Sequence, residues 1–403
     1  MQIYFSIFSR FLILGCTSFG GPAAHLGYFH KLFVQELKWL SEDDYSQIVA
    51  LSQILPGPGS SQTGFAIGLH RGGLAGGILA FLGFTLPSFI LMAILAVYQS
   101  HFTDSSIYTG VVSGLKLLAV IVVADAVISM ARTFCQTRLL IGLTIVTTAA
   151  LLLFPSLWIQ LLLLLLMAGV GAIWAQPKVG SSRSVDERIN AKSGLITKNA
   201  YLSSKLWLVL FLILFSFSLI SLAFDYPQLL SIFSQFYQSG SLVFGGGHVV
   251  LPLLQQSMGD TISSEQFITG YAAAQGVPGP MFTLATYLGA IVHVDNPWIG
   301  ALVATLAIFL PGFLLILGVR HQWKEWSKKP LIAGAINGIN AAVVGLLAAA
   351  FYQPILVNAV DDSFDLLIAI IGLLLLRKNK VPLIYLLLIS VIVGVLRTFL
   401  AIY

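Results

Sequence analysis

The chain has 403 residues, of which 57% are hydrophobic and 9% are charged, and its mean hydropathy is +0.92. Soluble domains carry about 25% charged residues, so this composition excludes a soluble multidomain protein and indicates an all-α polytopic membrane protein. The net charge of +5 is typical of membrane proteins with Lys- and Arg-rich cytoplasmic loops. It is therefore no sign of a nucleic-acid partner. The two cysteines lie far apart in apolar runs, which argues against a disulfide framework.

The two halves of the chain repeat the same landmarks in the same order. The motif FGGP at residues 19–22 returns as FGGG at 244–247, and Pro-Gly-Pro at 56–58 returns at 278–280. Leu-Pro pairs and spaced glycines then follow in both halves, at an offset of 224 residues. Ordered landmarks at a nearly constant offset indicate a duplication. Because the first motif belongs to the repeat, we expect the N-terminal segment to be part of the mature fold rather than a cleaved signal peptide.

The distribution of basic residues predicts that the second half is inverted. Residues 99–107 carry no Lys or Arg whereas the equivalent 320–330 carry four, and residues 132–138 carry two whereas 352–363 carry none. Under the positive-inside rule, equivalent loops therefore lie on opposite sides of the plasma (inner) membrane, with the N-terminus and the linker in the cytoplasm. The predicted parts are an N-terminal repeat (1–175), a linker (176–205), a linking transmembrane helix (206–224) and an inverted C-terminal repeat (225–403).

Apolar segments of two kinds are predicted. Continuous ones, expected to span the membrane, cover residues 73–98, 107–131, 139–154, 156–175, 206–224, 297–319, 331–351, 363–376 and 381–399. Others are interrupted midway by Gly and Pro and are expected to be broken or re-entrant helices: 4–35, 46–70, 228–258 and 265–294. Backbone left unpaired at such breaks is tolerated at membrane depth only inside protein or along a wet cavity. Simple kinks are the alternative, but breaks at equivalent positions of an inverted repeat point to a transporter's binding site.

The breaks carry the chemistry of an anion site. Helix N-termini exposed there direct free N–H groups and the positive end of the helix dipole into the cavity. Hydroxyl and amide side chains that follow each Pro-Gly-Pro add donors, although Ser and Thr can instead bond to their own helices. The residues expected to bind the substrate are Gly20, Gly21, His25, Gly57, Pro58, Ser60, Ser61, Gln62, Lys116, Gly245, Gly246, His248, Gly279, Pro280 and Thr283.

Ionisable residues at membrane depth are costly and are functional candidates. Lys116 is expected to supply positive charge to a bound anion, with snorkelling or an ion pair as the alternative. Asp125, His25 and His248 are candidates for proton coupling, with structural hydrogen bonds as the alternative. The sequence contains no metal-binding, nucleophile-elbow or phosphate-loop motif, so no metal, cofactor or enzymatic activity is expected.

These motifs resemble those of the chromate ion transporter family. The resemblance rests on FGGP with AxH (Phe19 to His25), FGGGHxxxP (Phe244 to Pro252) and the two Pro-Gly-Pro motifs, and it covers nearly the whole chain. It implies a long, two-domain member with antiparallel halves that exports chromate or a related oxyanion, driven by an ion gradient. The implied partners are that anion, a coupling ion such as H⁺ and the lipid bilayer, and a homodimer is left open. The alternatives are a passive anion channel on the same fold and a membrane-embedded enzyme that uses its histidines.

Overall fold

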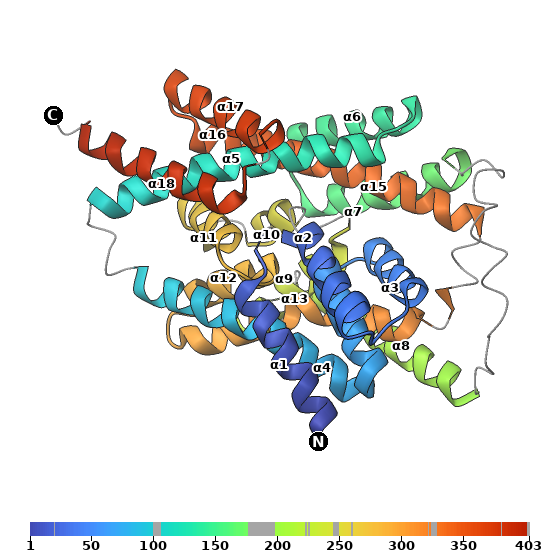
Figure 1. Cartoon of the computed structure of the whole chain (residues 1–403). Helices are drawn as coiled ribbons and strands as arrows, with labels where there is room; N and C mark the ends of the chain where they lie inside the picture. The colour runs from blue at the N-terminus through green and yellow to red at the C-terminus, as the bar shows by residue number, and fades with distance from the viewer. Residues whose placement is uncertain are drawn as a thin grey trace.

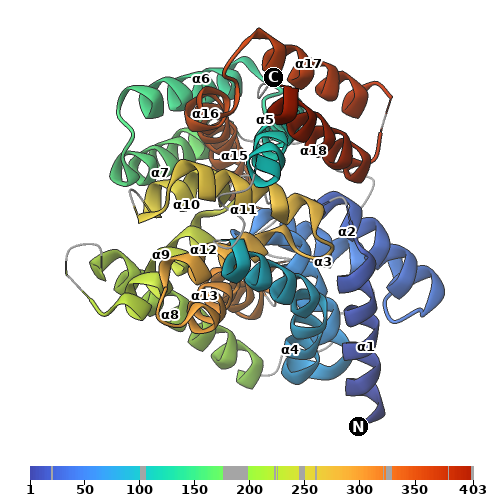
Figure 2. The same cartoon turned by 90° about the vertical axis from the view of Figure 1, so that its left-hand side faces the viewer.

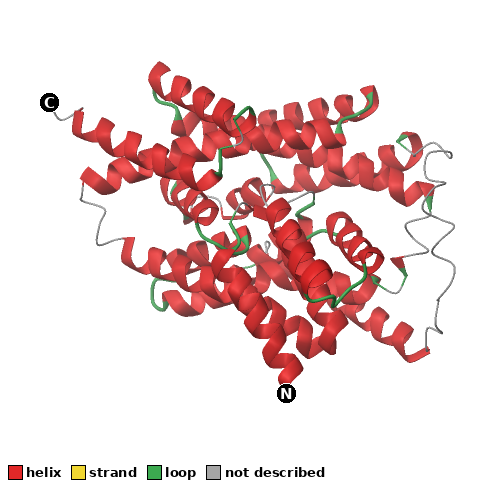
Figure 3. Cartoon of the chain, in the orientation of Figure 1, coloured by secondary structure: helices red, strands yellow, loops and turns green. Residues whose placement is uncertain are grey.

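The computed structural model describes residues 1–19, 21–99, 106–175, 198–221, 224, 226–244, 250–258, 261–320, 322–323, 329–379 and 381–400. Every element in these residues is a helix (Figure 3). They are α1 (Gln2–Thr17), α2 (Gly21–Phe29), the π-helix η1 (His30–Glu36), α3 (Glu42–Ile54), α4 (Gly59–Tyr98), α5 (Ser106–Phe134), α6 (Arg138–Leu153), α7 (Leu157–Trp174), α8 (Lys198–Ile220), α9 (Gln228–Leu242), α10 (Val250–Met258), α11 (Ser264–Gly276), the 3₁₀ turn η6 (Met281–Thr283), α12 (Leu284–Val292), α13 (Pro297–Val319), α15 (Pro330–Ala350), the π-helix η7 (Phe351–Leu356), α16 (Val357–Ala359), α17 (Ser363–Arg377) and α18 (Leu383–Leu400).

The continuous apolar segments coincide with helices. Among the described residues, α4, α5, α13 and the stretch 330–359 are long and apolar enough to cross a bilayer, and shorter apolar helices accompany them. Within α4 the backbone leaves the helical region at Gly72 and Gly73, so α4 is two helices joined by a tight turn, and the second begins where the 73–98 span was predicted. The chain is an all-α, multi-pass membrane protein, as its composition predicted.

One boundary differs from the expectation. Helix α8 begins at Lys198, inside the range 176–205 that the sequence assigned to the linker, while residues 176–197 lie outside the described part of the chain. The first residues of α8 are polar and basic, so hydropathy marks only the apolar part of the helix. The good helix formers among them continue the helix beyond that apolar part.

All four predicted breaks separate two helices. The breaks lie between α1 and α2, between α3 and α4, between α9 and α10, and between α11 and η6. Three of them fall at the first FGG motif and the two Pro-Gly-Pro motifs, because Pro offers no backbone donor and Gly adopts angles that other residues avoid. Residues 245–249 of the second FGG motif lie outside the described residues. The described backbone is therefore interrupted at the positions where the sequence predicted it.

The helices form two lobes that do not correspond to the two halves of the sequence. Figure 1 shows α5, α6, α7, α15, α17 and α18 in an upper lobe, and α1, α4, α8, α9, α12 and α13 in a lower lobe. Helices α10 and α11 lie between them (Figure 2). In the upper lobe, α7 from the first half packs against α15 from the second, and α18 from the second packs against α5 from the first. Each lobe is thus built from both halves.

Glycines from the repeated landmarks form the helix crossings of the upper lobe. Gly114 of α5 lies against the backbone of Ser390 on α18, and Gly338 of α15 lies against the backbone of Met167 on α7. A Cβ atom at either glycine would overlap a carbonyl oxygen of the facing helix. Small residues let membrane helices approach this closely, so the repeated glycines serve packing and not the substrate.

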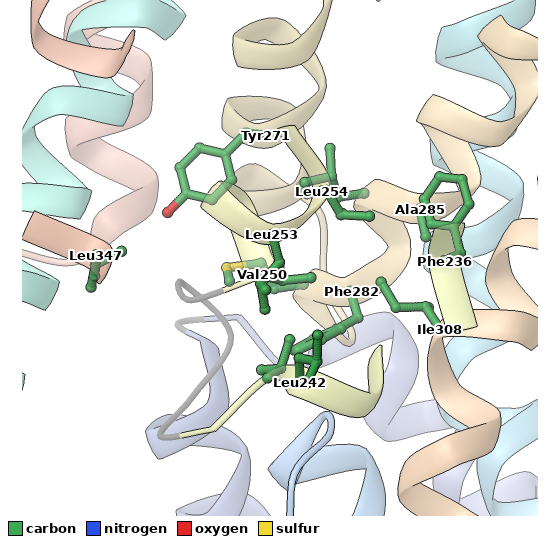
Figure 4. Packing of buried hydrophobic residues seen from close by; sticks show 14 of the residues in the cluster. Phe236, Leu242, Val250, Leu253, Leu254, Tyr271, Phe282, Ala285, Ile308 and Leu347 are labelled. Carbon is green, nitrogen blue, oxygen red and sulfur yellow. The ribbon is translucent and has the colours of Figure 1, made fainter. Parts of the chain in front are cut away.

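Buried apolar side chains hold the second-half breaks in place. Leu242 at the end of α9, Val250 at the start of α10 and Phe282 in η6 converge in one cluster (Figure 4). Ile308 of α13 joins the same cluster, and all four side chains are buried. The ends of the interrupted helices are therefore fixed by packing against neighbouring helices.

Candidate functional site

The two Pro-Gly-Pro loops are held by reciprocal hydrogen bonds. The N–H of Gly57 donates to the carbonyl of Val243 (N···O 2.7 Å), just before the FGG break of the second half. The N–H of Gly279 donates to the carbonyl of Ser18 (N···O 2.9 Å), just before the FGG break of the first half. The φ angles of Gly57 (+128°) and Gly279 (+102°) favour glycine. Each loop therefore docks on the break of the other half.

Each loop also packs against the Leu-Pro helix of the other half. A Cβ atom at Gly57 would lie 3.0 Å from the Cα of Gly312 on α13, and one at Gly279 would lie 2.9 Å from the Oγ of Ser88 on α4. Gly312 and Ser88 each follow the proline of a Leu-Pro landmark. The combination of a Pro-Gly-Pro loop, an FGG break and a proline-containing helix is therefore built twice.

Helix N-termini meet at these loops. Helix α2 begins after the first FGG break, α4 begins after the first Pro-Gly-Pro, and η6 leads into α12 after the second. Helix α2 packs against α4, and α11 packs against both α4 and α12, in the layer where the lobes meet (Figure 2). The first N–H groups of a helix have no partner within it, and the dipole adds positive potential. This geometry can bind an anion without a buried counter-charge.

His25 and Ser60 are brought together at this point. His25 is buried on α2, its Nδ1 lies 3.3 Å from the Oγ of Ser60 at the start of α4, and its ring packs edge-on against Phe84. The imidazole lies beside the backbone of Ser18, but its Nε2 makes no hydrogen bond of normal geometry. The imidazole is thus held by Ser60 and lies against the backbone of Ser18 beside the first FGG break.

Gln62 and Thr283 are committed to the protein backbone. The Nε2 of Gln62, which is fully buried, donates to the carbonyls of Pro56 (3.0 Å) and Gly312 (3.2 Å), so both of its amide hydrogens are used. The hydroxyl of Thr283 donates to the carbonyl of Pro280 (2.8 Å). These two residues fix the Pro-Gly-Pro loops. For Thr283 this is the structural alternative that the sequence left open, whereas the buried Oε1 of Gln62 has no hydrogen bond within the described residues.

Other buried polar atoms near the loops lack partners. Within the described residues, Ser61, directly after Ser60, has a buried hydroxyl without a hydrogen bond, and so do Ser18 before the first break and Thr85 beside Phe84. An unsatisfied buried polar group costs about 1–3 kcal/mol, so such groups are candidates to meet a ligand. Sequence reasoning missed Ser18 and Thr85, although each directly precedes a repeated landmark. Further buried atoms without a hydrogen bond in the described part of the chain belong to Ser52, Gln62, Gln160, Ser234, Gln238 and Thr269.

The two predicted charges lie in the upper lobe. Lys116 is half-buried on α5 and takes part in none of the ion pairs found within the described residues. Asp125 accepts a hydrogen bond from Nη1 of Arg377 at 2.8 Å, and this arginine also reaches the Oγ of Ser129. The pair ties α5 to α17, so Asp125 has a structural partner, and its role in proton coupling stays a prediction.

Several predicted residues fall outside the described part of the chain, and others shape the backbone. Gly20, Gly245, Gly246 and His248 are not described. Gly21 opens α2 with φ +75°, and Pro58 directly precedes α4. Within the described residues, no group of three His, Cys, Asp or Glu side chains could hold a metal ion.

Comparison with known proteins identifies the family. The chromate transporter family model matches residues 5–173 and again residues 230–395. An uncharacterised transporter of Methanocaldococcus jannaschii is 26% identical over 97% of this chain and 94% of its own length. A probable chromate transport protein of Synechococcus elongatus is 28% identical over 96% and 93%, and the chromate transport protein of Cupriavidus metallidurans is 27% identical over 92% and 87%. No solved structure matches the chain. With both halves matched by the same family model, this chain belongs to the chromate transporter family.

Proposed function

We propose that the chain is a secondary active transporter that exports a tetrahedral oxyanion, chromate or a sulfate-like dianion, across the plasma membrane by alternating access. The observation that carries this proposal is the doubled loop arrangement, in which Gly57 and Gly279 bring helix N-termini together between two lobes. Relatives over nearly the whole length include chromate transport proteins. The N-terminus and the linker lie in the cytoplasm in this proposal.

The oxyanion is bound mainly by backbone N–H groups. The N-termini of α2, α4 and η6 supply donors and positive potential, and the free hydroxyl of Ser61 adds a side-chain donor. Charge-assisted hydrogen bonds of this kind are about twice as strong as neutral ones. Lys116 lies on α5 in the upper lobe. It adds positive charge to the site when the two lobes approach each other around the anion.

A proton is the proposed coupling ion, and His25 is its best-placed carrier. His25 bonds to Ser60 at the start of α4 and keeps one buried ring nitrogen without a normal hydrogen bond. Protonation there would place a positive charge beside the anion; burial of the ring disfavours that charge, so the negative charge of the bound anion is what would stabilise it. Each would then strengthen the binding of the other, so this scheme carries the proton and the anion in the same direction.

Flux measurements in liposomes test the proposal. Purified protein should give saturable transport of chromate or sulfate that responds to a pH gradient, and Ser61→Ala should lower the rate more than Ser9→Ala. Ser9 is the matched control because its hydroxyl bonds to the carbonyl of Ser6 within α1. Absence of oxyanion flux under every gradient would overturn the assignment. Conductance steps in planar bilayers would instead favour the passive channel.

A further inference from the structure

An apolar cavity lies where the two lobes meet, away from the loops that bind the anion in the proposed function. Its volume is about 660 Å³. The upper-lobe wall comes from α7 and includes Trp158 and Leu165, and the lower-lobe wall comes from α8 and α9 and includes Phe215 and Leu242. Pro56 of the first Pro-Gly-Pro loop also lines it. The cavity therefore connects both lobes with one of the two loops.

One side of this cavity faces the lipid. Among the lining side chains, Trp158 is 61% exposed and Leu165 is 73% exposed, whereas Leu164 is 7% and Leu242 is 9% exposed. Exposed apolar residues on a helix of a multi-pass membrane protein lie against acyl chains, which are the solvent there. The cavity thus opens to the hydrocarbon of the bilayer and extends inward from it.

Its chemistry excludes a polar occupant. Among the lining side chains of the described residues, Ser241 and Trp158 carry the polar atoms; the hydroxyl of Ser241 already donates to the carbonyl of Tyr237 (2.7 Å), and the indole N–H of Trp158 is a single donor on an otherwise apolar wall. One donor cannot replace the hydration of an oxyanion, and apolar cavities stay free of water. An empty cavity would lose dispersion contacts along its whole lining. Its volume of 660 Å³ far exceeds the ~150 Å³ that accommodates benzene, so it has room for a larger apolar ligand.

We propose that an acyl chain of a bilayer phospholipid occupies this cavity, with its end against Pro56 and Phe244. The chain enters between α7 and α8 and lies between walls that belong to different lobes. It therefore contacts the first Pro-Gly-Pro loop and the residue that begins the second FGG motif. This binding does not depend on the identity of the transported anion, so the two proposals can fail separately.

Photo-crosslinking in liposomes tests the proposal directly. The probe is a phosphatidylcholine with a diazirine near the end of one acyl chain, and adducts are mapped by mass spectrometry. We expect adducts on residues 241–244, as well as on the lipid-facing α17, where Leu367 and Ile370 are exposed. Labelling of α17 without any labelling of residues 241–244 would overturn the proposal.

A cavity-filling variant gives the control. Ala168→Trp places an indole inside the cavity, because Ala168 lines it, and should reduce adducts on residues 241–244 severalfold while labelling of α17 stays constant. Leu166→Trp is the matched control, because Leu166 is exposed on the same helix and does not line the cavity, and it should leave all adducts unchanged. Should Ala168→Trp not fold, Leu161→Trp serves the same purpose. Unchanged adducts in a folded, filled variant would contradict the assignment.

Discussion

The glycines of the two Pro-Gly-Pro loops give the sharpest test of the doubled arrangement. We predict that Gly57→Ala and Gly279→Ala both lower thermal stability and transport, since each residue has a φ angle that L residues rarely adopt and touches the other half of the chain. Gly169→Ala is the matched control, because a Cβ atom at Gly169 on α7 would meet nothing within 4 Å. The control should unfold at the temperature of the wild type or above it, since Ala favours helices over Gly.

The expected loss follows from the local geometry. Backbone strain at a glycine-only conformation costs about 1–3 kcal/mol. At Gly57 the new Cβ would also lie 3.0 Å from the Cα of Gly312, a backbone atom that cannot move aside, so the hydrogen bond from Gly57 to Val243 weakens at a cost of about 1 kcal/mol. The sum is roughly 2–4 kcal/mol. At Gly279 the nearest atom is the Oγ of Ser88, which can rotate, so the loss should be smaller.

Thermal unfolding of the purified protein in detergent measures this loss. At about 2 °C per kcal/mol, which is the lower end for chains of 150–250 residues, Gly57→Ala should lower the melting temperature by roughly 4–8 °C. The order of stability should be Gly169→Ala, then Gly279→Ala, then Gly57→Ala. Oxyanion flux in liposomes should follow the same order. If Gly57→Ala melts and transports like Gly169→Ala, the reciprocal loop contacts do not support the site and the reasoning is wrong.

Three further substitutions test other parts of the structure. Gln62→Leu removes the donor that joins the carbonyls of Pro56 and Gly312 and should destabilise the protein by about 1–3 kcal/mol in thermal unfolding. Stability equal to that of the wild type would contradict the role of Gln62 in holding the first Pro-Gly-Pro loop. Asp125→Asn should lower stability by about 1–2 kcal/mol through its pair with an arginine, without moving the pH profile of transport, whereas a shifted profile would show that Asp125 carries the proton. Gly338→Ala should destabilise the protein by about 1–3 kcal/mol through overpacking against α7. Gly142→Ala, whose Cβ would meet open space, should leave the stability unchanged. Equal melting temperatures of the two variants would contradict the close contact of α15 with α7 at Gly338.

The interruptions of the backbone could be predicted from the sequence because their causes are local. Proline lacks a donor and glycine permits unusual φ angles wherever they occur, so a Gly-Pro cluster within an apolar run disfavours a continuous helix whatever surrounds it. The breaks at the first FGG motif and at both Pro-Gly-Pro motifs are confirmed for this reason, and the all-α class is confirmed by the helices. Helix α8 starts at Lys198, before the apolar segment predicted from residue 206, because hydropathy reports the apolar part of a helix and not its hydrogen bonding.

The roles of individual side chains could not be predicted in the same way. Gln62 was expected to offer its amide to the substrate, but the structure gives both amide hydrogens to the carbonyls of Pro56 and Gly312. Gly312 lies 250 residues away in the sequence, so the competing acceptor is set by tertiary packing alone. The same holds for Asp125, whose partner Arg377 lies on α17.

The two loops are alike in backbone but differ in side chains, and this difference bears on function. After the first Pro-Gly-Pro the chain supplies Ser60, Ser61 and Gln62, with His25 bonded to Ser60, whereas the equivalent residues after the second include Met281 and Thr283. Within the described residues the backbone donors are therefore doubled, whereas the unbonded hydroxyl of Ser61 and the pair of Ser60 and His25 belong to the first loop; His248 of the second FGG motif lies outside the described residues. The second loop holds the FGG break of the first half in place through Gly279 and Ser18. In the described part of the chain, the duplication thus provides the backbone framework twice and the serine hydroxyls of the first loop once.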